Sequence, residues 1–97
     1  MAAPIDWSAP SPRVNLLDLI RVELLPLGMM PTCTLNGRTT RAIVVFDGLY
    51  VEGHGLYEDP SPAARAATGV SLNGWKYWKL PDGRALADLR QQYLSEH

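Results

Sequence analysis

The sequence predicts an α+β domain in which a small antiparallel sheet packs with helices, in the order α-β-β-β-α-β-α. Apolar residues recur at helical spacing after Asn15 and again toward the C-terminus. Between these segments, residues 32–52 are rich in Thr, Ile and Val, which favour strands. The dipeptides Asn36-Gly37 and Asp47-Gly48 divide this stretch at hairpin turns. We therefore expect a three-stranded meander, joined by a later strand at residues 75–80.

The length and composition predict one soluble domain. The chain has 97 residues and 46% apolar content, which is enough for a single core of modest stability. Residues 1–13 hold three prolines and few apolar side chains, so we expect a flexible arm there, with Trp7 available to dock, and one domain over 14–97. The sequence has no apolar run of the roughly 18 residues that a membrane span needs, and no signal-peptide pattern. With a single cysteine, Cys33, it predicts a cytoplasmic protein in a reducing compartment.

The first helix is expected to begin at Asn15, a good N-cap residue. Asp18 follows three residues later, as in a weak capping box. Pro26 and Gly28 are expected to end this helix, which should be largely buried. The strands of the meander are then expected at Thr32–Leu35, Arg38–Phe46 and Leu49–Glu52.

The second half of the chain begins with Gly53-His54-Gly55, which we expect to be a flexible exit from the sheet. Ser61 is then expected to be the N-cap of a short alanine-rich helix, with Pro62 at its first position, and Gly69 should end that helix. A last helix is expected to carry Leu86, Leu89 and Tyr93 on one face.

The run Asn73-Gly74-Trp75-Lys76-Tyr77-Trp78 contains three of the eight aromatic residues of the chain. Residues 75–80 alternate as a strand, closed by a turn at Pro81-Asp82-Gly83. Trp78 and Leu80 should face the core, because an aliphatic residue accompanies the indole on that side. The partly exposed face would then carry Trp75, Tyr77 and Lys79.

The distribution of charge separates two parts of the chain. A net charge of −1 gives no overall basic signature, so a nucleic-acid interpretation depends on local charge. Residues 42–59 carry four acids and no Lys or Arg. Residues 60–80 carry Arg65, Lys76 and Lys79 and no acid. The basic segment is therefore the one that contains the aromatic run.

Five segments of the chain form a characteristic set: Asp47-Gly48, Ser61-Pro62-Ala63-Ala64, Thr68-Gly69, Asn73-Gly74-Trp75-x-Tyr77-Trp78 and Leu86-x-x-Leu89-Arg90. Taken in order, they resemble the RAMA domain, the restriction enzyme adenine methylase-associated domain. The resemblance covers about residues 14–94. It implies a small α+β module that binds double-stranded DNA, with a proposed preference for modified bases such as N6-methyladenine. The family occurs fused to adenine methyltransferases and other restriction-modification proteins, whereas this chain is expected to stand alone.

The resemblance and the local charge together predict a DNA-binding surface. Lysine and arginine side chains would neutralise phosphates, and the amides around Ser61 would hold another phosphate. Aromatic rings would stack on a base or contact an adenine methyl group, and Asn73 would pair with an adenine edge. The alternatives are helix capping, a tight turn, core packing and a solvated surface. The predicted residues are Ser61, Arg65, Asn73, Trp75, Lys76, Tyr77, Lys79 and Arg41.

Catalysis finds little support in the sequence, and no cofactor or metal is expected. His54 lies between glycines that would position it poorly, and Cys33 has no basic neighbour and should be a buried, inert thiol. Arg38 and Arg90 are further basic candidates, with Arg90 expected to pair with an acid inside the fold. The alternative function is a non-catalytic adaptor that docks on a methyltransferase or restriction protein, or serves a phage system, through exposed aromatics. A DNA-binding role would associate the protein with the nucleoid.

Overall fold

The computed structural model describes residues 14–96, and these form an α+β fold. The predicted fold class and order of elements are confirmed, with a fourth strand after the meander and a short helix before the last strand. The elements are α1 (Leu16–Arg21), β1 (Thr32–Leu35), β2 (Arg38–Val45), β3 (Gly48–Val51), β4 (Gly55–Tyr57), α2 (Pro60–Thr68), α3 (Gly74–Tyr77), β5 (Trp78–Lys79) and α4 (Leu86–Glu96). The predicted arm at residues 1–13, including Trp7, lies outside the described residues.

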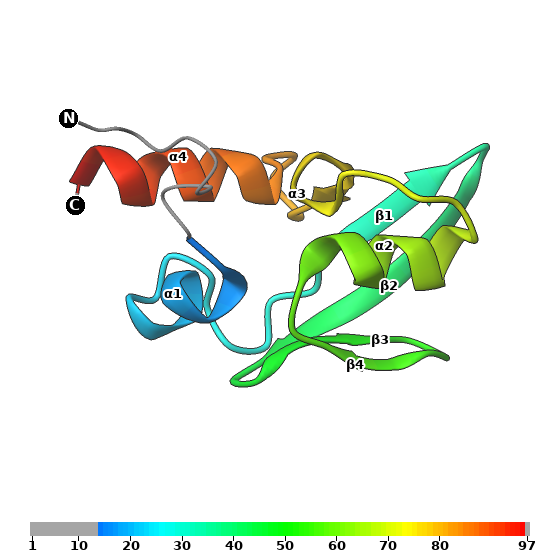
Figure 1. The fold of residues 1–97 in the computed structure, drawn as a ribbon, viewed down its shortest axis with the longest axis horizontal. Coiled ribbons are helices and arrows are strands. Elements are labelled where there is room, and N and C mark those ends of the chain that lie inside the picture. The colour runs from blue at the N-terminus through cyan, green and yellow to red at the C-terminus, as the bar shows by residue number, and fades with distance from the viewer. Residues whose placement is uncertain (1–13, 97) are drawn as a thin grey trace, which may run out of the picture.

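The five strands form one antiparallel sheet in the order β4-β3-β2-β1-β5. Figure 1 shows α2 lying across one face of this sheet, while α4 extends away from it with α1 alongside. The core fills the space between α2 and the sheet and continues beneath α1 and α4. Within residues 14–96, each helix is too short or too polar to span a bilayer. The fully buried side chains include Leu16, Leu19, Leu25, Cys33, Leu49, Val51, Trp78 and Leu86.

Both hairpins of the meander form close to the predicted turn dipeptides, and the second turn lies one residue earlier in the sequence than predicted. Asn36 and Gly37 have φ values of 54° and 80°, which suits a two-residue turn between paired Leu35 and Arg38. At the second turn, β2 ends at Val45 rather than Phe46, and Gly48 is the first residue of β3. A Cβ at Gly48 would collide with the backbone of Tyr57 in β4, so this glycine is required by a neighbouring strand.

The predicted flexible exit at Gly53-His54-Gly55 was wrong, because Gly55 begins an additional edge strand. In β4, Leu56 pairs with Tyr50 and Tyr57 pairs with Leu49 of β3. The turn before it is fixed by a backbone hydrogen bond from His54 N–H to the Val51 carbonyl, at 2.9 Å. A strand of three residues is too short to show the two-residue alternation by which strands are recognised.

The first helix begins as predicted but ends earlier. Asn15 and Asp18 form a reciprocal capping box, with N–H to side-chain distances of 3.1 and 3.0 Å. The helix stops at Arg21, because Glu23 adopts a left-handed conformation with φ of 63°. Leu24 and Leu25 both donate backbone hydrogen bonds to the Leu19 carbonyl from the following loop. Leu25 thereby reaches the core without belonging to the helix.

The strand predicted over residues 75–80 was also wrong in its first half. Residues 74–77 form the one-turn helix α3, and only Trp78 and Lys79 pair with Cys33 and Thr32 of β1. The predicted burial nevertheless holds, since Trp78 and Leu80 are buried and Trp75 and Tyr77 are half-buried. One helical turn followed by an extended residue therefore produces the burial pattern that was interpreted as strand alternation.

Cys33 is buried, as the sequence predicted. Its side chain is inaccessible in the middle of β1, and burial raises the pKa of the thiol. We expect the native protein to react with a thiol reagent far more slowly than free cysteine does, because the thiolate is both disfavoured and shielded. Absorbance on addition of DTNB, with and without concentrated urea, measures this difference. Equal rates in the two conditions would show that β1 is open in the native state.

Candidate nucleic-acid interface

The aromatic run is held against the first turn of α2 by two hydrogen bonds. Ser61 Oγ accepts a hydrogen bond from the Gly74 N–H at 2.9 Å. The buried Trp78 indole donates from Nε1 to the Pro60 carbonyl at 3.0 Å. The same four residues thus join α2, α3 and β5, and we call this contact the α2–α3 junction.

The α2–α3 junction leaves no room for a side chain at Gly74. A Cβ at this position would overlap the Pro60 carbonyl and the Ser61 amide, both of them backbone groups that cannot rotate away. Any larger residue would therefore push α3 from α2 and stretch both hydrogen bonds.

Asn73 is the N-cap of α3, and its side-chain oxygen accepts a hydrogen bond from the Trp75 N–H at 3.1 Å. The tight Asn-Gly turn considered from the sequence is therefore a helix cap. This bond occupies the carbonyl oxygen that a bidentate contact with an adenine edge would use.

Ser61 was wrongly predicted as the N-cap of α2. Asp59 is the N-cap, and Pro60 is the first helical residue. The sequence contains two prolines here, Pro60 and Pro62, and either of them could have been the first residue of the helix. The Ser61 hydroxyl oxygen faces Gly74 instead. The exposed acids Glu58 and Asp59 precede this helix start, so the local charge disfavours a phosphate there.

Trp75 has one ring face covered by Arg90. The guanidinium carbon of Arg90 lies 4.6 Å from the ring centroid, a cation–π distance. The predicted pairing of Arg90 with an acid was wrong, because Arg90 contacts this ring and forms no ion pair within residues 14–96. Trp75 and Tyr77 are half-buried against the core, so packing limits the surface they offer to a base.

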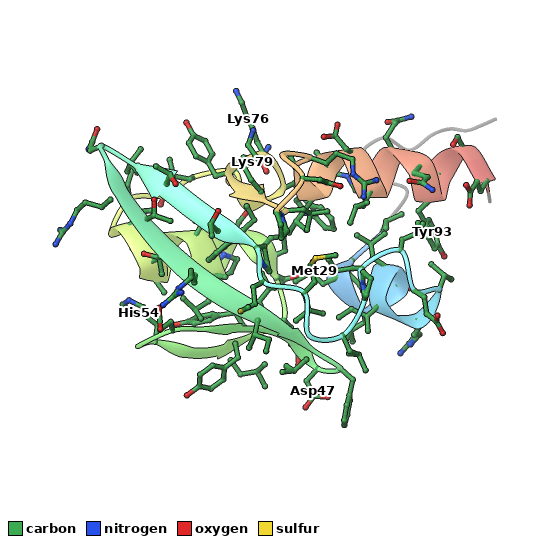
Figure 2. All side chains as sticks on the ribbon, turned by 180° about the vertical axis from the view of Figure 1, so that it is seen from behind. Met29, Asp47, His54, Lys76, Lys79 and Tyr93 are labelled. Carbon is green, nitrogen blue, oxygen red and sulfur yellow. The ribbon has the colours of Figure 1, made fainter. Side chains whose placement is uncertain are left out.

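Lys76, Lys79 and Arg41 lie on the side of the molecule away from α2. Lys76 is two residues from Gly74 on α3, which turns it away from the α2–α3 junction. Lys79 and Lys76 project from neighbouring positions in Figure 2, which views the molecule from behind. Both lysines are exposed, and neither has an acidic partner within residues 14–96.

The register of the sheet aligns Lys79 with Arg41. Thr32 of β1 is the pairing partner of Lys79 on one side and of Arg41 on the other. Directly paired residues of antiparallel strands project from the same face, so these three side chains form one row across β5, β1 and β2. We call Lys79, Thr32 and Arg41 the basic row. Arg41 also contacts Glu52 at 3.4 Å, a solvent-exposed ion pair with both side chains 64% exposed, which contributes little energy.

Arg65 and Arg38 are separated from the basic row. Arg65 is exposed on α2, on the other side of the sheet, where it lines a hollow with Ser61, Pro62, Ser71 and Leu72. Arg38 lies three residues before Arg41 on β2 and therefore projects from the opposite face. With His54, it lines a hollow of about 520 Å³ between the β1–β2 hairpin and the end of α2. The predicted surface thus divides between two faces.

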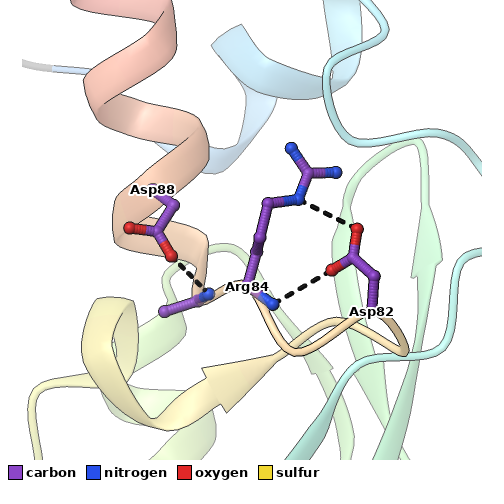
Figure 3. Close-up of polar contacts among 4 residues, drawn as sticks. Asp82, Arg84 and Asp88 are labelled. Atoms are coloured by element: carbon purple, nitrogen blue, oxygen red, sulfur yellow. Dashed lines mark hydrogen bonds and ion pairs between the residues drawn. The ribbon is translucent and has the colours of Figure 1, made fainter.

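A polar turn connects the basic row to α4 (Figure 3). Asp82 accepts hydrogen bonds from the Arg84 N–H at 3.0 Å and from Arg84 Nε at 2.9 Å. The first of these bonds lowers the pKa of the Asp82 carboxyl. Asp88 accepts from the Ala85 N–H at 2.9 Å, which fixes the start of α4. Arg84 is therefore a structural cation, whereas the lysines are not engaged.

No group of three or more His, Cys, Asp or Glu side chains within residues 14–96 could hold a metal ion.

The sequence matches the family model described as RAMA, Restriction Enzyme Adenine Methylase Associated, over residues 4–97. This confirms the resemblance seen in the aromatic run and extends it to nearly the whole chain. No curated protein has a significant match to the sequence.

The α2–α3 junction predicts that Gly74→Ala destabilises the protein. We expect a loss of about 2–3 kcal/mol from overpacking against fixed backbone. Ser61→Ala should cost about 1–2 kcal/mol, because it leaves the buried Gly74 N–H without an acceptor. Urea denaturation measures both free energies of unfolding.

Ser71→Ala is the matched control for Ser61→Ala, because Ser71 is exposed in the loop before α3. It should change stability by less than about 0.5 kcal/mol. Equal effects of the two serine substitutions would contradict the role assigned to the junction.

Proposed function

Because this chain belongs to the RAMA family, the restriction enzyme adenine methylase-associated domains, we propose that it is a non-catalytic DNA-binding module. One observation carries the proposal: Lys79, Thr32 and Arg41 stand in a single row across three neighbouring strands, with Lys76 beside it. The row offers two fixed cations and a hydroxyl group to successive phosphates. In this proposal, Arg65 and Ser61 do not contact the DNA.

The electrostatics of the basic row suit a phosphate backbone better than an isolated anion. Double-stranded DNA presents closely spaced phosphates, and each lysine or arginine that contacts one releases condensed counterions. Strands lie about 4.8 Å apart, so Lys79 and Arg41 are separated at their backbones by about 10 Å. Three contacts, from Lys76, Lys79 and Arg41, give a salt slope of about −2.7 at about 0.9 per phosphate.

We also propose that the module discriminates modified adenine, a proposal motivated by the association with adenine methylases for which the family is named. Trp75 and Tyr77 are half-buried against the core, so part of each side chain stays accessible. A partly accessible aromatic side chain can offer apolar contact to a methyl group without a free ring face. Discrimination would then appear as a difference in affinity between duplexes with and without N6-methyladenine.

The adaptor alternative assigned a protein-binding hot spot to the aromatic run. The half-buried state of Trp75 and Tyr77 and the Arg90 contact weigh against that location. A methyltransferase or restriction protein remains a proposed partner, and such binding should show little dependence on salt.

The proposal predicts that Lys76→Ala/Lys79→Ala weakens binding to every duplex sequence. We expect a loss of roughly tenfold or more at moderate salt, and a salt slope reduced by about 2, because two phosphate contacts disappear. Fluorescence anisotropy of a labelled duplex at several salt concentrations measures both quantities, with matched duplexes that contain N6-methyladenine.

Arg21→Ala/Arg65→Ala is the control, because it removes the same charge from exposed positions outside the row. Its affinity and slope should stay near those of the unmodified protein. If the two double variants lose affinity equally, general charge and not the basic row accounts for binding.

A further inference from the structure

The face of the sheet opposite α2 carries a second row beside the basic row. Ile43 of β2 pairs with Tyr50 of β3, and Tyr50 pairs with Leu56 of β4. Met30 extends this row, because the segment before β1 continues along β2 through hydrogen bonds between Met29 and Val44 and between Pro31 and Ala42. We call Met30, Ile43, Tyr50 and Leu56 the apolar row.

The apolar row is open to solvent. Its four side chains are between 38% and 53% exposed, although three of them lie in strands of the sheet and Met30 lies in the segment that continues β1. Figure 2 shows no helix over this face, whereas α2 covers the other (Figure 1). An exposed line of large apolar groups is costly in water and commonly marks a binding surface.

The two rows are adjacent and meet in one concavity. Arg41 and Ile43 are two residues apart on β2, so they share this face. Glu52 directly follows β3, two residues after Tyr50, and its N–H donates to the Arg41 carbonyl at 2.9 Å, which continues the pairing of the two strands. A hollow of about 360 Å³ lies between them, lined by Met30, Arg41, Ala42, Ile43, Tyr50 and Glu52. A cation thus stands at one side of the hollow and an aromatic ring at the other.

We propose that this face binds an unpaired DNA strand, with a base stacked on Tyr50 and the flanking phosphates on the basic row. Aromatic side chains on an open sheet are stacking platforms for unpaired bases, and neighbouring cations follow the backbone. The charge of the basic row favours a polyanion over an uncharged protein surface. This inference rests on the proposed DNA-binding function and specifies the form of DNA that the sheet accepts.

A duplex does not present its bases to this surface. The major groove admits a helix or a two-stranded ribbon, whereas a five-stranded sheet is too broad to enter. Against a duplex, Lys76, Lys79 and Arg41 therefore reach phosphates and the apolar row reaches no base, so the proposed contact with a modified adenine is left to Trp75 and Tyr77 of α3. A single strand, or a strand locally unpaired, allows a base to reach Tyr50 as well.

The test compares a labelled single strand with the corresponding duplex by anisotropy, using the full chain. Tyr50→Ala should weaken single-strand binding by roughly fivefold to 150-fold, the measured range for removing one stacking ring. Its duplex affinity should change less than about twofold, because phosphate contacts remain. Tyr50→Phe keeps the ring and should retain single-strand affinity, and the retained duplex affinity of Tyr50→Ala excludes a folding defect as the cause of its loss.

Phe46→Ala is the matched aromatic control, because Phe46 is 73% exposed but lies in the β2–β3 turn outside the apolar row. Its single-strand affinity should be unchanged. Equal losses for Phe46→Ala and Tyr50→Ala, or equal losses on both forms of DNA, would overturn the stacking role. A failure of the proposed function would be recognised separately, because Lys76→Ala/Lys79→Ala would then leave duplex binding intact.

Sedimentation of the unmodified protein tests whether a second copy of the chain, and not DNA, binds the apolar row. A monomer at micromolar concentration with Tyr50-dependent binding of the single strand supports the inference. Self-association that Tyr50→Ala abolishes, together with no affinity for the single strand, would assign the apolar row to a protein interface instead.

Discussion

The fold depends on the close approach of the Gly74 backbone to the first turn of α2. This contact brings the Gly74 N–H to Ser61 and places the Trp78 indole under the Pro60 carbonyl. It therefore fixes both ends of the short segment from α3 to β5, although α3 has a single turn and β5 has two residues. Elements of that length have little stability of their own, so the junction and the burial of Trp78 supply most of their order. Moving Gly74 would move Lys76 and Lys79 with it.

This constraint changes the meaning of the aromatic run. Asn73 caps α3, Gly74 provides space, Trp75 packs beneath Arg90, and Trp78 fills the core. Most of the run is thus structural, and the residues left for contact with phosphates are Lys76 within it and Lys79 just after it. The side chains that first suggested recognition hold the surface in position, while less distinctive neighbours carry its charge.

Local signals in the sequence predicted those parts of the fold that local interactions determine. The Asn15 capping box, the Asn36-Gly37 hairpin and the left-handed Gly69 at the end of α2 each depend on a few adjacent residues. The role of Ser61 could not be predicted in this way, because its partner is thirteen positions away. The basic row was hidden for a related reason, since Arg41 and Lys79 become neighbours only through their shared pairing with Thr32.

The two faces of the sheet differ because α2 covers only one of them. Ala63 and Ala64 of α2 belong to the same buried cluster as Val44 and Leu49 of the covered face, where small and branched residues allow close packing. On the open face, the same strands present Arg41 and Tyr50, which burial would not tolerate as well. The meander therefore builds the core and the candidate interface from alternate residues of the same strands. A one-residue slip in its register would bury the basic row and expose the core, so the turns that set this register also determine whether the surface exists.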